Sequence, residues 1–208
     1  MKPQDASAWL LDLGGVLTDD VWQRMVLTPG EGLADRLGID RQAAEAAGTQ
    51  LWERYAVRPE ADEDEYWRDL ATLVGVPIPS SLVSETEQKL VRANPESSAL
   101  VRGLEERRAR IGVLSNNTAF WYPKQARLAG IEHAVDPELV FLSFRARVTK
   151  EDVPGLFEVA ANRVPALAAT VVVDDQLELV RQARRVGFRA IHYPPDWSRS
   201  LVDHLLPR

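Results

Sequence analysis

Short, mostly apolar runs recur near the start and in the second half of the chain, and such runs are typical of buried parallel strands. They lie at residues 9–11, 111–114, 139–142, 169–173 and 189–192. Before, between and after the later runs, apolar side chains return three and four positions apart, which predicts helices. We expect these helices over residues 97–108, 119–129, 154–161, 177–186 and 198–205. Alternating strands and helices predict an α/β fold with a Rossmann-like, doubly wound parallel sheet.

The strand pattern stops after residue 18, and helical spacing takes its place over a long stretch. Apolar residues follow that spacing in the segments 33–51 and 66–74. The acidic run Asp62–Glu65 precedes the second segment, and carboxylates favour a helix N-terminus. Ser80 or Ser81 is expected to cap a further helix, and Ser198 the last helix of the chain.

The position of this helical block predicts how the chain is divided. The block follows the first strand and precedes the second, so the chain leaves the sheet and later returns to it. We predict a core made of residues 1–18 and 96–208. Residues 19–95 would form an inserted helical cap over the ends of the strands.

Composition narrows the class of protein. The net charge of -6 argues against nucleic acid or an anionic membrane as a partner. The chain contains no cysteine, which excludes disulfides, a thiol nucleophile and cysteine-based zinc sites. Residues Met1–Asp5 do not resemble a signal peptide, and no apolar run is long enough to span a membrane. We therefore expect a cytoplasmic protein, either a monomer or a homodimer.

Polar residues follow three of the predicted strands. Asp12 follows the first run, Ser115 follows the second, and Asp174 with Asp175 follows the run at 169–173. The carboxyl ends of parallel strands meet at one edge of the sheet, where open α/β proteins bind their ligands. We therefore expect these side chains to converge.

Carboxylates that converge repel one another unless a cation joins them. Oxygen ligands suit Mg²⁺, which proteins hold through one or two carboxylates together with water and a substrate phosphate. Lys150 and the Ser115 hydroxyl are donors suited to phosphate oxygens. Gly14 and Gly15 let the backbone come close to a ligand, and a carboxylate such as Asp12 can attack phosphorus. This set of residues indicates phosphoryl transfer.

Four short motifs, in this order, resemble those of the haloacid dehalogenase (HAD) superfamily of hydrolases, and the resemblance covers essentially the whole chain. The motifs are Asp12–Leu17, Leu114–Asn116, Lys150 and Val173–Asp175. The resemblance implies that Asp12 is the nucleophile, that Ser115 holds the phosphate and that Lys150 stabilises the pentacoordinate phosphorus.

The resemblance also implies a metal site. Mg²⁺ would be bound by Asp12, the main-chain carbonyl of Gly14 and Asp175, while Asp174 would act through water.

Substrate binding is implied in the same way. Asn116 and the backbone of Gly14 and Gly15 would contact the phosphate. The Gly-Gly first motif and the Ser-Asn second motif resemble most the bacterial glucose-1-phosphate phosphatases and the phosphatase domain of soluble epoxide hydrolases. This implies a small phosphorylated metabolite, such as a sugar phosphate, as the substrate.

The first motif departs from the pattern that is commonest in family phosphatases. Those proteins carry a second Asp two residues after the nucleophile, which protonates the leaving oxygen, and here that position is Gly14. General acid–base help is worth roughly 10²–10⁴-fold. Asp19 and Asp20 lie nearby, but we interpret them as a solvated turn that leads into the cap.

The third and fourth motifs differ as well. The loop after Lys150 reaches Phe157 with one residue more than is usual, which leaves Arg145 and Arg147 as fallback cations. Leu179 stands where a polar residue often follows the fourth motif.

Aromatic residues are candidates for lining a substrate pocket between cap and core. For Trp22, Trp52, Tyr55 and Trp67 we favour packing within the cap. Trp121 comes shortly after the second motif and is our aromatic candidate for substrate binding.

Three hypotheses describe the function. The favoured one is a Mg²⁺-dependent phosphatase that acts on a small phosphorylated metabolite through an aspartyl phosphate. The second is a metal-independent, haloacid dehalogenase-type hydrolase, in which Asp12 displaces halide and no leaving oxygen needs a proton. The third is a catalytically silent protein that binds a phosphorylated ligand or a protein partner, which Gly14, the longer loop after Lys150 and Leu179 support.

Overall fold

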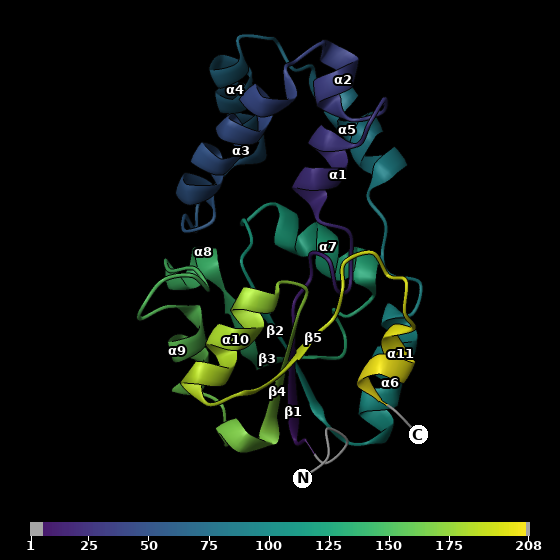
Figure 1. Cartoon of the computed structure of the whole chain (residues 1–208), viewed down its shortest axis with the longest axis vertical. Helices are drawn as coiled ribbons and strands as arrows, with labels where there is room; N and C mark the ends of the chain where they lie inside the picture. The colour runs from purple at the N-terminus through teal and green to yellow at the C-terminus, as the bar shows by residue number, and fades with distance from the viewer. Residues whose placement is uncertain (1–5, 207–208) are drawn as a thin grey trace.

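The computed structural model describes residues 6–206 and divides them into a sheet-based core and a helical cap (Figure 1). The start of the chain, Met1–Asp5, lies outside the described residues, as do residues 207–208. Within residues 6–206, no helix has both the length and the apolar character needed to cross a bilayer.

The core contains a five-stranded parallel sheet in the order β3-β2-β1-β4-β5. Its strands are β1 (Ala8–Leu11), β2 (Arg110–Ser115), β3 (Val135–Leu142), β4 (Thr170–Asp174) and β5 (Arg189–His192). Helices lie on both faces of the sheet, so the predicted Rossmann-like α/β fold is confirmed (Figure 1).

The register of β1 brings the ends of three strands together. Leu11 pairs with Val113 of β2 on one side and with Val173 of β4 on the other. The backbone N–H of Asp12 donates to the carbonyl of Val173 at 3.0 Å, which holds Asp12 at the carboxyl edge of the sheet. Residues that follow β1, β2 and β4 are therefore neighbours in space.

Successive side chains of a strand point to opposite faces of the sheet, and the core helices cover both faces. They are α6 (Ser97–Glu106), α7 (Trp121–Ala129), α8 (Ser143–Ala146), α9 (Leu156–Ala161), α10 (Leu177–Val186) and α11 (Leu201–Leu205), with a short 3₁₀ helix at Leu167–Ala169. Trp9 and Leu11 of β1 pack with α6 and α11, whereas Leu10 packs with α9 and α10. Burial on both faces explains why β1 is apolar throughout.

Five helices form the cap and follow directly from β1. They are α1 (Val21–Leu27), α2 (Leu33–Leu37), α3 (Arg41–Tyr55), α4 (Glu63–Val74) and α5 (Ser80–Leu90). Two antiparallel segments join cap to core, with a bridge between Thr18 and Ala93 and a bond of 2.9 Å from the Asn94 N–H to the Leu17 carbonyl. The paired segments allow the cap to be inserted without interrupting the sheet.

Both serine caps named from the sequence are wrong. Pro79 holds the N-cap position of α5 and Ser80 is already helical, while Ser200 rather than Ser198 caps α11. Proline has no backbone N–H to donate. It is tolerated at the start of a helix because the first N–H groups there have no acceptor within the helix.

Two element boundaries also differ from the sequence pattern. The periodic segment 33–51 is divided at Gly38, which ends α2 in the left-handed region (φ 67°). Strand β3 begins at Val135 rather than at the predicted residue 139. Its first half is polar and contains Pro137, and the strand lies at the edge of the sheet. Proline is tolerated there because one side of an edge strand has no partner.

Candidate active site

Three carboxylates converge at the carboxyl edge of the sheet. Asp12 follows β1, Asp174 is the last residue of β4, and Asp175 follows it. One oxygen from each of these side chains lies within 4.8 Å of the others. The predicted convergence of the strand ends is therefore present in the fold.

Lys150 reaches this cluster from the loop between α8 and α9. Its Nζ lies 2.6 Å from Oδ2 of Asp12 and 2.6 Å from Oδ2 of Asp174. Both lysine and Asp174 are almost fully buried, with exposed side-chain fractions of 1% and 0%. A buried ion pair of this kind needs further hydrogen bonds to offset the loss of water. The backbone supplies them, since Leu13 N–H donates to Asp12 at 2.7 Å and Gln176 N–H donates to Asp174 at 2.9 Å.

Burial and mutual repulsion set the protonation of the cluster. Burial raises the pKa of Asp12 to about 6, although the Lys150 charge opposes the shift. Burial and the charges of Asp12 and Asp174 raise the pKa of Asp175 to about 7. Burial by itself would lower the pKa of Lys150, but the two neighbouring carboxylates outweigh it and raise that pKa. Lys150 therefore stays charged, and Asp12 is mostly ionised at neutral pH.

The longer loop after Lys150 is held by the second motif. The Asn116 side chain accepts a bond of 2.8 Å from the Lys150 N–H and donates one of 2.6 Å to Glu151. Both ends of the Asn116 amide are thus engaged by the loop, although the residue also lines the cavity described below. The fallback cation Arg145 lies over the ring of Tyr122 instead, 5.4 Å from its centroid.

Gly14 and Gly15 form a tight turn after Asp12. Gly15 has a left-handed backbone (φ 73°), and a Cβ built on it would overlap the Asp175 carboxylate. The carbonyl of Gly15 accepts a bond of 3.0 Å from the Trp197 indole N–H. Glycine is therefore required at this position both by backbone conformation and by space.

A buried amide network stands beside Ser115. The Asn117 amide donates to the Gln125 carbonyl oxygen at 2.8 Å, and Gln125 donates to the Thr18 hydroxyl at 2.7 Å. The Ser115 hydroxyl lies near enough to Asp12 to lower its pKa. Asn117 and Gln125 were not named from the sequence, because a buried amide on a helix or loop carries no distinctive pattern.

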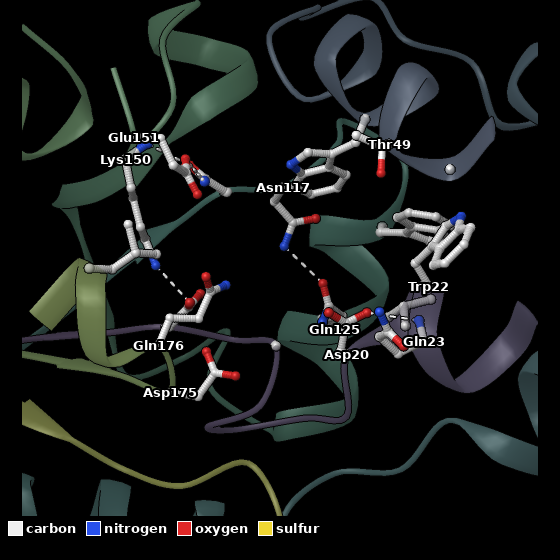
Figure 2. Close-up of a pocket in the computed structure, with 18 of the residues that line it drawn as sticks. Asp20, Trp22, Gln23, Thr49, Asn117, Gln125, Lys150, Glu151, Asp175 and Gln176 are labelled. Atoms are coloured by element: carbon white, nitrogen blue, oxygen red, sulfur yellow. Dashed lines mark hydrogen bonds and ion pairs between the residues drawn. The ribbon is translucent and has the colours of Figure 1, made fainter. Parts of the chain in front are cut away.

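Cap and core enclose a cavity of about 310 Å³ above the carboxylates. In Figure 2, Lys150, Asp175 and Gln176 lie on one side of this cavity, and Trp22 and Thr49 on the other. Asp12, Gly14 and Asn116 also line it, as does Leu179 at the place where a polar residue is usual. The sequence-predicted site therefore faces a space large enough for a small molecule.

The solvated turn that we expected at Asp19 and Asp20 is present only in part, because Asp19 is buried whereas Asp20 is exposed. The Asp19 side chain is buried and ion-paired, 2.7 Å from Arg24 Nε, and it accepts from the Arg92 N–H at 2.8 Å. Asp20 caps α1 by accepting from Gln23 N–H at 2.9 Å, and it lines the cavity. Part of Asp20 remains exposed, but surrounding atoms limit its hydration and raise the pKa of its carboxyl. The interpretation of a solvated turn is therefore wrong for Asp19 and holds for Asp20, in the segment that joins core and cap.

The aromatic candidates separate into two groups. Trp22, Trp52 and Trp121 line the cavity, although Trp121 is 2% exposed and packs mainly against cap residues. Tyr55 and Trp67 belong to the cap's apolar cluster and do not line the cavity, as we favoured for them. Trp22 and Trp52 also pack against that cluster, as we favoured, and they line the cavity as well.

One helix face of the cap was missed by sequence reasoning. Glu45, Gly48, Thr49 and Trp52 of α3 all line the cavity, and their spacing of three, four and seven residues places them on one face. The same spacing is visible in the sequence, but an exposed Glu and Thr on a helix have no feature that marks them as cavity residues.

The residues present fit a divalent cation. The donor set contains three carboxylates, and no described residue donates a hydrogen bond to the Asp175 side chain. A partly buried carboxylate with a raised pKa and free lone pairs, such as that of Asp175, suits an oxygen-seeking metal such as Mg²⁺. Asp12, Asp174 and Asp175 are the residues that would hold it.

Comparisons with known proteins give fold-level similarity. No protein-family model and no curated protein matches the chain. The HAD family enzyme bt-2542 from Bacteroides thetaiotaomicron matches with a TM-score of 0.63 and 14% identity, covering 93% of this chain and 97% of that chain. The L-2-haloacid dehalogenase RSc1362 matches with a TM-score of 0.63 and 20% identity, covering 97% of each. A form of bt-2542 in complex with magnesium and inorganic phosphate matches with a TM-score of 0.60 and 15% identity, covering 93% of this chain and 98% of that chain. The chain therefore has the α/β fold of HAD-family enzymes.

Proposed function

We propose that the protein is a Mg²⁺-dependent phosphatase that hydrolyses a small phosphate monoester through an aspartyl phosphate. The observation that carries this proposal is the geometry of Lys150, whose Nζ lies 2.6 Å from both Asp12 and Asp174. A lysine so placed leaves Asp12 ionised and adds positive charge where a transferred phosphoryl group would develop negative charge. The magnesium and phosphate held by bt-2542, which has the same fold, support this choice of substrate.

Asp12 is the proposed nucleophile. One of its carboxylate oxygens forms a bond to phosphorus while the ester P–O bond breaks, which gives an aspartyl phosphate and frees the alcohol oxygen. Water then attacks the same phosphorus, so inorganic phosphate leaves and Asp12 is regenerated. Ser115 and Lys150 hold the phosphoryl oxygens during both steps. When Mg²⁺ is bound by Asp12, Asp174 and Asp175, it supplies further positive charge to that group.

Asp20 is the proposed proton donor. An alkyl alcohol leaves as an alkoxide unless it receives a proton, so a general acid must face the cavity. Asp20 lines that cavity, and only one of its oxygens is used as the helix cap. It would give its proton to the leaving oxygen in the first step and take a proton from water in the second.

A dehalogenase is the second candidate, because two of the solved structures with this fold are described as dehalogenases. In that reaction Asp12 would displace halide from carbon, with neither metal nor proton donor. The cluster of Asp12, Asp174 and Asp175 counts against it, since three carboxylates need more positive charge than Lys150 provides.

Phosphate release with and without Mg²⁺ tests the proposal. We would assay 4-nitrophenyl phosphate and glucose 1-phosphate, with Asp12→Asn as the matched blank. Magnesium-dependent release that disappears in the variant is expected. Release of chloride from 2-chloropropionate in the presence of EDTA would favour the dehalogenase. Binding of phosphate esters without any turnover would instead favour a catalytically silent protein.

A further inference from the structure

The cavity has a cap wall whose chemistry differs from that of the phosphate site. One face of α3 forms this wall through Glu45, Gly48, Thr49 and Trp52. The ring of Trp22 lies on Gly48, and a Cβ built at that position would overlap the indole. Gly48 therefore allows the indole to lie close to α3 beside the cavity. The part of a substrate that extends from the phosphate toward the cap meets this wall.

The charged side chains that line the cavity are mostly acidic. The acidic residues that line it are Asp12, Asp20, Glu45, Glu151 and Asp175. Among the described lining residues, Lys150 is the only lysine or arginine, and both of its neighbours at 2.6 Å are carboxylates. The end of the cavity near the cap therefore has no cation to receive a second negative group.

Glu45 is the acidic residue that the cap itself brings to the cavity. Its side chain is exposed, and no lysine or arginine within residues 6–206 lies at ion-pair distance from it. Trp52 lies on the same face of α3 as Glu45, and the ring of Trp22 packs on Gly48 of that face. An indole face and an unpaired carboxylate are together suited to an ammonium group, which the ring quadrupole and the negative charge both attract.

We propose that the substrate is the phosphate monoester of an alcohol that carries an ammonium group, and that Glu45 selects it. The inference rests on the proposed phosphatase function and adds the chemical class of the leaving alcohol. The phosphate lies at Asp12 and Lys150, while the ammonium group lies between Glu45 and the two indoles. Phosphorylated acids and bisphosphates are disfavoured because the described cavity lining offers no second lysine or arginine to their second anion.

Three substrates of nearly equal size test this assignment, because they differ mainly in the charge at the far end. They are 2-aminoethyl phosphate, 2-hydroxyethyl phosphate and phosphoglycolate, with 4-nitrophenyl phosphate as the reference. An exposed ion pair and an exposed cation–π contact are each worth up to about 1 kcal/mol, so kcat/KM should be about tenfold higher for the amine than for the alcohol. It should be lower still for phosphoglycolate. Equal values, or a preference for phosphoglycolate, would overturn the inference.

The variant Glu45→Gln tests whether Glu45 is the residue that selects the ammonium group. The variant should lose about threefold to fivefold in kcat/KM for 2-aminoethyl phosphate and clearly less for 2-hydroxyethyl phosphate, which carries no ammonium group. Glu53→Gln is the matched control, because it makes the same charge change on α3 outside the cavity lining. Calorimetric binding of 2-aminoethyl phosphate to Asp12→Asn, with and without Glu45→Gln, gives a readout that does not need turnover. An unchanged Kd there would remove Glu45 from the assignment.

Failure of this inference differs from failure of the proposed function. If 4-nitrophenyl phosphate is hydrolysed but the amine is not preferred, the substrate class is wrong and the phosphatase remains. If neither is hydrolysed, the phosphatase itself is wrong and the substrate class falls with it.

Discussion

Asp20 lies beside the position that a side chain at residue 14 would occupy. A Cβ built on Gly14 would lie 3.7 Å from the Cα of Asp20, which is ordinary van der Waals contact. The absence of a carboxylate at position 14 is thus matched by a carboxylate that reaches the same cavity from Asp20. The two positions are six residues apart, but the turn after β1 folds them together.

Asp20→Asn should therefore impair the phosphatase in a way that depends on the leaving group. Asn caps a helix as well as Asp does, so α1 should remain intact. Loss of the proton donor should lower kcat by roughly 10²–10⁴-fold for an alkyl phosphate, and only slightly for 4-nitrophenyl phosphate, whose leaving group needs no proton. Steady-state kinetics with both esters measure the difference. Equal losses would show that Asp20 supports the structure rather than the leaving oxygen.

Lys150→Met should affect both stability and activity. The change leaves the Asp12 and Asp174 carboxylates buried without their partner, which typically costs about 3–5 kcal/mol in the free energy of unfolding. Urea denaturation without Mg²⁺ measures this loss, and phosphate release should fall to the level of Asp12→Asn. High Mg²⁺ should recover part of the stability without recovering turnover.

Lys124→Met is the matched control for that variant. Lys124 joins the core helix α7 to the cap through Glu63 and Glu87 at 2.8 Å each, but its side chain is 40% exposed. An ion pair this exposed contributes about 1 kcal/mol or less. If both lysine variants lose the same stability, burial is not what makes Lys150 important.

The core and its acidic edge were predictable for a physical reason. Apolar runs that end in Asp12, Ser115 and Asp174 specify buried parallel strands, and parallel strands place their carboxyl ends at one edge. Lys150 could be named from a motif, but the way its loop is held by Asn116 depends on a contact between residues 34 positions apart. Sequence spacing carries no information about such a contact.

The cap side of the cavity was not predictable in this way. Helical spacing shows that Glu45 and Trp52 share a face, but not whether that face meets solvent or another domain. The sequence places Asp20 only in a turn that leads into the cap domain, and it does not show that this turn faces a cavity. What decides their role is how the cap is seated on the core, which is set by packing between elements distant in the chain.

Gly15→Ala should weaken magnesium binding as well as the fold. Alanine in the left-handed region costs roughly 1–2 kcal/mol, and its Cβ would displace the Asp175 carboxylate. Gly30→Ala provides the control, since Gly30 has the same φ of 73° and nothing within 4 Å of its added Cβ. Both variants should lose similar backbone stability, but only Gly15→Ala should raise the Mg²⁺ concentration needed for half-maximal activity. If both variants needed a higher Mg²⁺ concentration, backbone strain rather than contact with Asp175 would control the metal site.

The stability of the metal-free protein should fall as the pH rises from about 4 to about 7. Asp175 has a pKa of about 7 in the folded protein, well above the ordinary value of 3.8. The folded state therefore holds this proton more tightly than the unfolded state, and the stability gained from it is complete at low pH. It is lost as the pH rises from about 4 toward 7, and Asp12, with a pKa of about 6, contributes in the same direction.

Magnesium should reverse this trend because it binds the ionised carboxylates. The increase in melting temperature caused by Mg²⁺ should be small at pH 5 and large at pH 8, where Asp175 no longer has to release a proton to accept the metal. Differential scanning fluorimetry with Mg²⁺ or EDTA across this range measures both effects. Asp175→Asn should flatten the metal-free decline and remove most of the magnesium shift. A magnesium shift of equal size at pH 5 and pH 8 would mean that the metal does not compete with the Asp175 proton.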